Sequence, residues 1–162
     1  MVRRRVFYSF HYQNDVMRVQ QIRNIGAIEG NTPAQPNDWE QIQNNSNAIK
    51  KWIDDNMNNR SCVVVLVGEE TANRNWVNYE IQKAWNEGRG LLGIYIHNIN
   101  CPRNGKCRKG QNPFDKYTIN GRRLSSIVKC YDPHPMNAYG DIKINMGNLI
   151  EEAIQIRSNY RG

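Results

Sequence analysis

The sequence contains no apolar run long enough to cross a membrane. No stretch approaches the roughly 18 consecutive apolar residues that a spanning helix requires. The first residues, Met-Val-Arg-Arg-Arg, lead directly into a strand-like pattern, without the apolar core and small-residue cleavage site of a secretory signal. These absences predict a cytoplasmic protein without a membrane-spanning segment.

Several common enzyme motifs are also missing. There is no G-x-G-x-x-G after the first strand-like run and no G-x-x-x-x-G-K-[ST], which argues against a dinucleotide fingerprint and a P-loop. No G-x-S-x-G nucleophile elbow occurs. The histidines lie far apart, and Cys101 and Cys107 are spaced too widely for a typical zinc site. The sequence therefore predicts neither a metal site nor a bound cofactor.

The composition is that of one globular domain. Of the 162 residues, 39% are hydrophobic and 23% are charged, and a chain of this length can bury a core of its own. We expect a single domain over residues 1–162. The formal net charge of +7 would suit a ligand that carries phosphates. The basic clusters have no interleaved aromatic residues, so the pattern does not favour nucleic acid as a partner.

Apolar patterning predicts alternating strands and helices. Strands are expected at residues 6–10, 27–28, 62–67, 91–96 and 127–131, and helices at 15–24, 39–56, 71–87 and 145–160. The run Cys62–Val67 is apolar throughout, which indicates a central parallel strand buried on both faces. The alternation predicts an α/β fold in which a mostly parallel sheet lies between two layers of helices. Ligands bind such sheets at the carboxyl ends of the strands.

Residues 97–125 are expected to form a long irregular segment. Segments of this length inside a compact domain are usually functional or mobile. Within it, residues 112–115 read as a structural turn, with Pro113 fixing the backbone and Phe114 reaching the core. Cys62, in contrast, lies inside a strand-like run and is expected to be a buried structural thiol.

Trp76 and Glu80 are the pair that could carry chemistry. Four residues apart, they lie on one face of the expected helix, next to a core-facing stripe that includes Val77 and Ile81. A carboxylate beside an indole near a strand end is partly desolvated and well placed to face a positive centre. The oxocarbenium-like ribose formed when a nicotinamide–ribose bond breaks is such a centre. The same spacing is more often core packing beside a solvated charge, so spacing alone leaves both interpretations open.

Three segments together resemble the TIR domain family. Residues 6–10, Val-Phe-Tyr-Ser-Phe, resemble the first TIR strand with its Ser-aromatic end, and Trp76 followed by Glu80 is similar to the TIR catalytic-helix motif. Together with Asn-Pro-Phe-Asp at 112–115, they resemble more narrowly the TIR-like proteins of the Thoeris antiphage system. The resemblance extends to about residue 131 and implies a flavodoxin-like three-layer sandwich.

The resemblance implies an NAD-processing enzyme of bacterial antiphage defence. Such enzymes cleave the nicotinamide–ribose bond of NAD and make a signalling nucleotide, either a cyclic ADP-ribose isomer or an ADP-ribose conjugate. The nucleotide activates a separate effector protein. NAD would then be the substrate rather than a cofactor. TIR sites are often completed by a neighbouring subunit, which would make the protein a homo-oligomer.

Carried onto this sequence, the resemblance makes Glu80 the catalytic carboxylate. The substrate-binding residues that it implies are Ser9, Phe10, His11, Asp38, Trp39 and Trp76. The first three end the first strand, and the next two follow the loop where TIR domains place substrate-gating residues. Two of these residues could have structural roles instead. His11 could form a hydrogen bond at the end of the strand, and Trp39 could pack at the start of its helix.

Three other functions remain open at this point. A non-catalytic TIR-like interaction module would use the same sheet for self-association, with Trp76 in its core. A nucleic-acid binder would use the basic loop at 103–109. A nucleoside deoxyribosyltransferase would also place a glutamate on a similar fold.

Overall fold

A five-stranded parallel sheet forms the centre of the molecule. The computed structural model describes residues 4–23, 29–30, 46–101 and 105–160. The strands run in the order β2-β1-β3-β4-β7, and each neighbouring pair is parallel. Their bounds are β1 Arg5–Ser9, β2 Glu29–Gly30, β3 Cys62–Val67, β4 Gly90–Tyr95 and β7 Cys130–Tyr131. This is the doubly wound order of flavodoxin-like folds.

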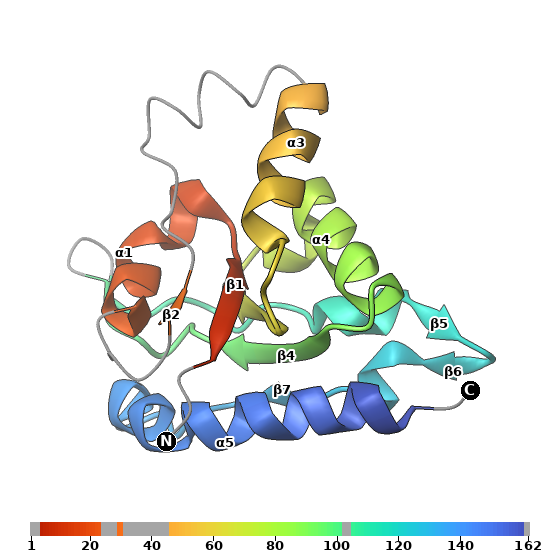
Figure 1. The fold of residues 1–162 in the computed structure, drawn as a ribbon. Coiled ribbons are helices and arrows are strands. Elements are labelled where there is room, and N and C mark those ends of the chain that lie inside the picture. The colour runs from red at the N-terminus through yellow and green to blue at the C-terminus, as the bar shows by residue number, and fades with distance from the viewer. Residues whose placement is uncertain (1–3, 24–28, 31–45, 102–104, 161–162) are drawn as a thin grey trace.

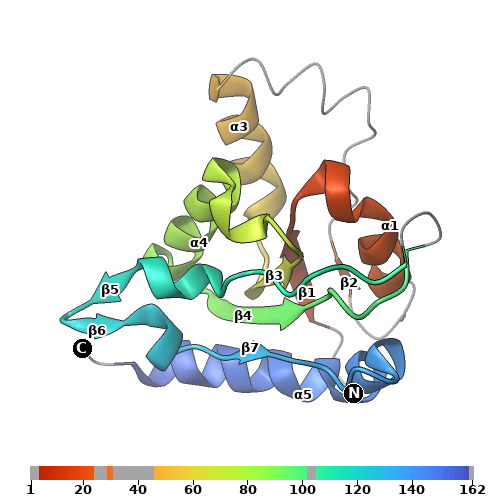
Figure 2. The same ribbon diagram turned by 180° about the vertical axis from the view of Figure 1, so that it is seen from behind.

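Helices cover both faces of the sheet, as Figures 1 and 2 show from opposite sides. Their bounds are α1 Tyr12–Arg23, α3 Ser46–Met57, α4 Asn75–Asn86 and α5 Ala138–Asn159. One core cluster joins the sheet to α1 and α5, and a second joins its other face to α3 and α4. The predicted three-layer α/β sandwich is confirmed.

The strand β3 is the most buried element. All six of its residues, including the Cys62 thiol, are fully inaccessible to solvent, as its continuous apolar run predicts. Successive side chains of a strand point to opposite faces, so β3 contributes Val63, Val65 and Val67 to the α3–α4 cluster and the alternate residues to the α1–α5 cluster. Burial on both sides is what places helices above and below the sheet.

Several predicted boundaries were wrong. The helix expected at 71–87 is divided into a 3₁₀ turn, Thr71–Asn73, and α4, because Arg74 adopts an extended backbone between them. The closing helix begins at Ala138 rather than 145, where the Asn137 side chain accepts a hydrogen bond from the Gly140 amide. The last strand is reduced to Cys130–Tyr131.

The segment at 97–125 is more ordered than predicted. It contains the 3₁₀ turns Pro113–Lys116 and Leu124–Ser126, and a hairpin of β5 (Thr118–Ile119) and β6 (Arg122–Arg123). Asn120 and Gly121 both have positive φ, as a two-residue hairpin turn requires. The turn predicted at 112–115 is confirmed, since the Asn112 side chain accepts from the Phe114 amide and the Phe114 ring is fully buried.

Two expectations fall wholly or partly on residues that are not described. The short strand expected at 27–28 lies outside the described residues, and β2 follows it at Glu29–Gly30. Of the helix expected at 39–56, the structure describes the part from Ser46, which forms α3.

Within the described ranges, no helix has the length and hydropathy needed to cross a membrane. All four cysteines are free thiols.

A buried arginine ties the loop after β4 to α1. Arg18 is 3% exposed, and its Nε donates to the Ile99 carbonyl at 2.9 Å. Its Nη2 donates to the Gly105 carbonyl at 2.8 Å, and its Nη1 lies 3.3 Å from Oδ1 of Asp15, which is also buried. One guanidinium therefore donates to two loop carbonyls and contacts one oxygen of a buried carboxylate.

Replacing this arginine should weaken the whole fold. Arg18→Ala leaves the Asp15 carboxylate buried without its cation and two carbonyls without a donor, so we expect a loss of about 3 kcal/mol or more in the free energy of unfolding. Urea unfolding at pH 7 measures the loss. Arg108→Ala, which removes an exposed arginine from the same loop, serves as the control. A loss below about 1 kcal/mol for Arg18→Ala would contradict the assigned role.

Candidate active site

The carboxyl edge of the sheet brings distant parts of the chain together. Strand β1 ends at Ser9, β3 leads into Gly68, and β4 leads into His97. Because all three strands are parallel, these ends lie on one side of the molecule. Helix α4 starts from the same edge after a short connection and carries Glu80 in its second turn. Ser9 and Glu80 therefore lie at the edge of the sheet where ligands bind in such folds.

Glu80 is buried at this edge and bonded to the end of β1. Its side chain is 6% exposed, and Ser9 is 1% exposed. The Ser9 hydroxyl donates to Glu80 Oε1, with 2.7 Å between the oxygens. The pleat of β1 explains the contact, because Phe7 and Ser9 project to the same face and Phe7 packs in the cluster that contains α4.

Burial makes Glu80 an unusually weak acid. The loss of solvent raises its pKa to about 8, and the hydrogen bond from Ser9 opposes this increase. Within the described part of the chain, no cation contributes to the pKa of this carboxyl group. Glu80 is therefore mostly protonated at neutral pH while the site holds no positive ligand. A cationic group placed beside it would favour ionisation.

Two aromatic residues precede Glu80 on α4, and the second of them, Tyr79, contacts Asp54 of α3. Trp76 is partly buried and packs against the α3–α4 cluster. Its ring meets Tyr79 edge-on, with 5.7 Å between the ring centroids. Val77 and Ile81 are buried in the core, as the helical spacing predicted. The sequence analysis assigned no contact to Tyr79. Its position three residues after Trp76 on a helix would have predicted that the two rings meet.

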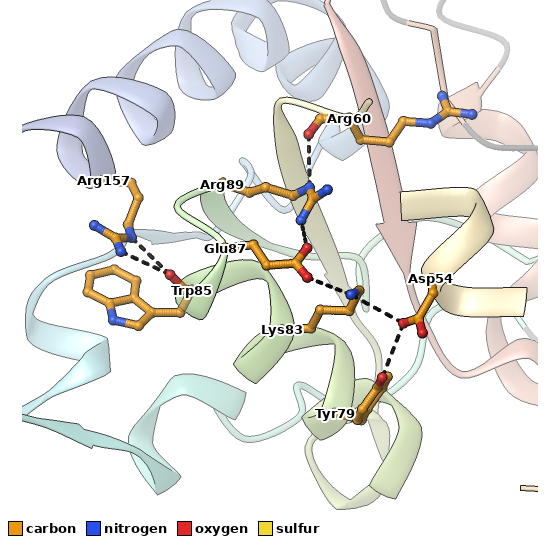
Figure 3. Close-up of polar contacts among 8 residues, drawn as sticks. All are labelled: Asp54, Arg60, Tyr79, Lys83, Trp85, Glu87, Arg89 and Arg157. Carbon is orange, nitrogen blue, oxygen red and sulfur yellow. Dashed lines mark hydrogen bonds and ion pairs between the residues drawn. The ribbon is translucent and has the colours of Figure 1, made fainter. Parts of the chain in front are cut away.

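A ladder of charges fixes α4 in place (Figure 3). Lys83 Nζ lies 3.2 Å from Asp54 Oδ1 on α3 and 2.6 Å from Glu87 Oε2. Arg89 pairs with Glu87, and its Nε donates to the Arg60 carbonyl just before β3. The Tyr79 hydroxyl donates to the same Asp54 oxygen at 3.2 Å. The helix that carries Glu80 is thus connected to α3 and to the entrance of β3.

A second anchor connects the end of α4 to the closing helix. Both Nε and Nη2 of Arg157 donate to the Trp85 carbonyl, at 3.1 and 3.0 Å, and the guanidinium lies 4.4 Å from the Trp85 ring centroid. Figure 3 shows this pair beside the ladder. The α4 helix is therefore restrained at its carboxyl end by α5 as well as by α3.

The other predicted site residues are placed differently. Phe10 is partly buried against the α1–α5 cluster, which lies on the face of the sheet away from α4. His11 is 7% exposed, its Nδ1 has no hydrogen-bond partner among the described residues, and burial lowers its pKa, with a smaller contribution from Arg74. Asp38 and Trp39 lie outside the described residues. The structure thus joins Ser9 to Glu80, and the substrate-binding roles stay predictions.

Two glycines at this edge allow neighbouring segments to pack closely, a contact that the sequence analysis did not predict. A side chain at Gly68 would collide with the Asp15 carboxylate, and one at Gly110 would collide with the Gly68 carbonyl. Asp15 is 1% exposed, and burial raises its pKa to about 6 against the opposing effect of Arg18. The two glycines were the only sequence signal of this packing. Among the described residues, no group of three metal-ligating side chains occurs.

Comparison with known proteins identifies relatives of this chain. The sequence model of the family described as "Thoeris protein ThsB, TIR-like domain" matches residues 7–100. A protein of Bacillus cereus (strain MSX-D12), named "Putative cyclic ADP-D-ribose synthase ThsB1", is 37% identical over 131 residues. The alignment covers 75% of this chain and 68% of that protein. The matched segment includes Ser9, Trp76 and Glu80.

The protonation of Glu80 predicts a stability effect. Its carboxyl group must take up a proton on folding at any pH between its ordinary pKa of 4.5 and its folded pKa of about 8. The contribution of Glu80 to the free energy of unfolding is therefore fully present below pH 4.5 and is lost as the pH rises through 8. Glu80→Gln, which resembles the neutral acid, should be more stable at pH 7 by up to about 3 kcal/mol.

Urea unfolding of both proteins at pH 4.5, 7 and 8 measures this difference. Glu152→Gln is the control, because Glu152 is exposed on α5 and pairs with Lys129 at the surface. The advantage of Glu80→Gln should shrink toward pH 4.5, whereas the control should show little change with pH. Equal stability of Glu80→Gln and the parent at pH 7 would contradict the protonated state.

Proposed function

Because this chain belongs to the family of TIR-like domains of the Thoeris protein ThsB, we propose that it is an enzyme that cleaves NAD. The bond broken is the one between nicotinamide and ribose, and Glu80 is the catalytic carboxylate. The observation that carries the proposal is the placement of Glu80, buried at the carboxyl edge of the sheet and hydrogen-bonded to Ser9.

The electrostatics of Glu80 suit a cationic substrate. The nicotinamide ring of NAD carries a positive charge. Without that ring, no cation among the described residues favours ionisation of Glu80. Entry of the ring beside the carboxyl group favours release of its proton, because an opposite charge stabilises the ionised form. As the glycosidic bond breaks, the positive charge moves to the ribose, and the carboxylate stabilises it there.

The reaction needs no strong acid for its leaving group. The electron pair of the broken bond returns to the ring nitrogen, so nicotinamide leaves as a neutral molecule. The oxocarbenium-like ribose is then attacked by water, which gives ADP-ribose, or by a nucleophile within the same molecule, which gives a cyclic product. In either case the nucleophile loses one proton. A single carboxylate can therefore support the chemistry, in contrast to glycosidases that use two.

We propose a cyclic ADP-ribose isomer or an ADP-ribose conjugate as the product. The name of the Bacillus cereus relative supports the cyclic alternative, since it refers to a cyclic ADP-D-ribose synthase. The family description refers to Thoeris, which supports a role in antiphage signalling through a separate effector. Trp76, and the partly buried Tyr79 beside it, would then wall the site, and His11 would contact the nucleotide. Completion of the site by a second copy of the chain is part of the same proposal.

The first test is nicotinamide release from NAD. Purified protein at concentrations that permit self-association should release nicotinamide, and Glu80→Gln should reduce the rate by at least about 100-fold because the developing charge loses its carboxylate. Chromatography measures the nicotinamide, and mass spectrometry of the remaining nucleotide distinguishes ADP-ribose, a cyclic product and a conjugate. Glu152→Gln, on the far helix α5, should keep the parent rate.

Two outcomes would overturn the proposal. The first is the absence of NAD turnover in the oligomeric protein, including protein taken from phage-infected cells. The second is equal signalling output from the parent and Glu80→Gln, which would favour a non-catalytic interaction module.

The pH dependence gives a second test. Since the carboxylate is the active form, kcat/KM should rise with pH and level off above a midpoint near 8, the pKa of Glu80 in the unliganded protein. The midpoint of kcat should lie lower, because the bound cationic ring lowers that pKa. Initial rates from pH 5.5 to 9.5 measure both profiles. A kcat/KM that falls between pH 6 and 8 would contradict the role assigned to Glu80.

A further inference from the structure

The hydroxyl of Ser9 joins the end of β1 to the Glu80 side chain on α4. Ser9 ends β1, where its backbone is paired in register with Val65 of β3. Its short side chain has one rotatable carbon torsion, and it is 1% exposed. Glu80 has a longer and more flexible side chain on α4. A hydrogen bond of 2.7 Å from the rigid strand therefore restricts where the carboxyl group of Glu80 can lie.

The bond uses one of the two carboxyl oxygens. Ser9 donates to Oε1, and within the described residues no other hydrogen bond to this carboxyl group is formed. Oε2 therefore accepts no hydrogen bond from the described residues. The bond also affects protonation, because a donor directed at a carboxylate favours the ionised form. Among the described residues, burial and this hydroxyl are the two influences on the pKa of Glu80, and they act in opposite directions.

Resting on the function proposed above, we propose that Ser9 is a positioning residue for Glu80, whose hydroxyl holds Oε1 and stabilises the carboxylate while Oε2 faces the ribose. This role differs from the nucleotide contact that family resemblance implies for the strand end. It requires no direct contact between Ser9 and substrate, in keeping with the 1% exposure of Ser9. Loss of the hydroxyl should therefore change kcat and its pH dependence more than KM.

Other titratable groups lie on the elements around Glu80. His11 follows β1, Asp54 lies on α3, Lys83 lies on α4, and Arg74 precedes α4. Asp54 and Lys83 are engaged with each other in the ladder. None of the four contributes to the pKa of Glu80, so a change in its titration after substitution of Ser9 reports on the hydroxyl itself.

The decisive experiment follows the titration of Glu80 without substrate. The carbonyl band of the protonated side chain is recorded by infrared difference spectroscopy across pH 5.5 to 10 and assigned by its absence in Glu80→Gln. Ser9→Ala should move the midpoint upward by about one pH unit, since a hydrogen bond to a charged group is lost. Ser9→Thr, which keeps the hydroxyl, should restore the parent midpoint. Thr71→Val is the matched control, because it removes a fully buried hydroxyl at the same edge that bonds Gly68 rather than Glu80.

The outcomes separate this inference from the proposed function. An unchanged midpoint in Ser9→Ala, or an equal shift in Thr71→Val, overturns the positioning role whatever the activity. A shift confined to Ser9→Ala supports it even in a protein that turns over no NAD, in which case the proposed function alone fails. In an active protein, Ser9→Ala should lower kcat at least 10-fold at pH 7 with less than a threefold change in KM. A larger effect on KM than on kcat would indicate substrate contact instead.

Discussion

The burial of β3 on both faces is the constraint from which the rest of the structure follows. A strand with no solvent-exposed residue needs a partner strand on each edge and a helical layer on each side. Parallel pairing with β1 and β4 meets the first need, and the α1–α5 and α3–α4 layers meet the second. Parallel pairing also places the carboxyl ends of the three strands on one edge. The position of the candidate site is thus a consequence of core formation.

The same burial explains the chemistry of Glu80. The α4 helix packs on the α3 side of β3, so a carboxyl group on its sheet-facing side enters a region with little water. The ladder through Lys83 and the contact of Arg157 with the Trp85 carbonyl hold the helix there. Surface charges of this kind contribute little to stability one by one, but together they restrain the helix on two sides. Glu80 is therefore buried on a helix that is held on two sides, and this burial raises its pKa.

The sequence predicted what depends on local pattern and missed what depends on distant contacts. The apolar run of β3, the periodicity of α4 and the turn around Phe114 were recognisable because each is encoded within a few residues. The Ser9–Glu80 bond joins residues 71 positions apart, and Arg18 reaches carbonyls 81 and 87 positions away, so no spacing rule could reveal either. The hairpin at Asn120-Gly121 was missed although its turn signal is local, because the surrounding strands are only two residues long.

The absence of a cationic partner for Glu80 among the described residues has a consequence for the proposed substrate. The dihydronicotinamide ring of NADH carries no charge, so it could not favour ionisation of Glu80 as we propose for the ring of NAD. If Glu80 acts as proposed, the buried site distinguishes the oxidised coenzyme from the reduced one by charge rather than by shape. The protein would then consume NAD and not NADH. The ratio of the two coenzymes in the cell would therefore influence how much signalling nucleotide is made.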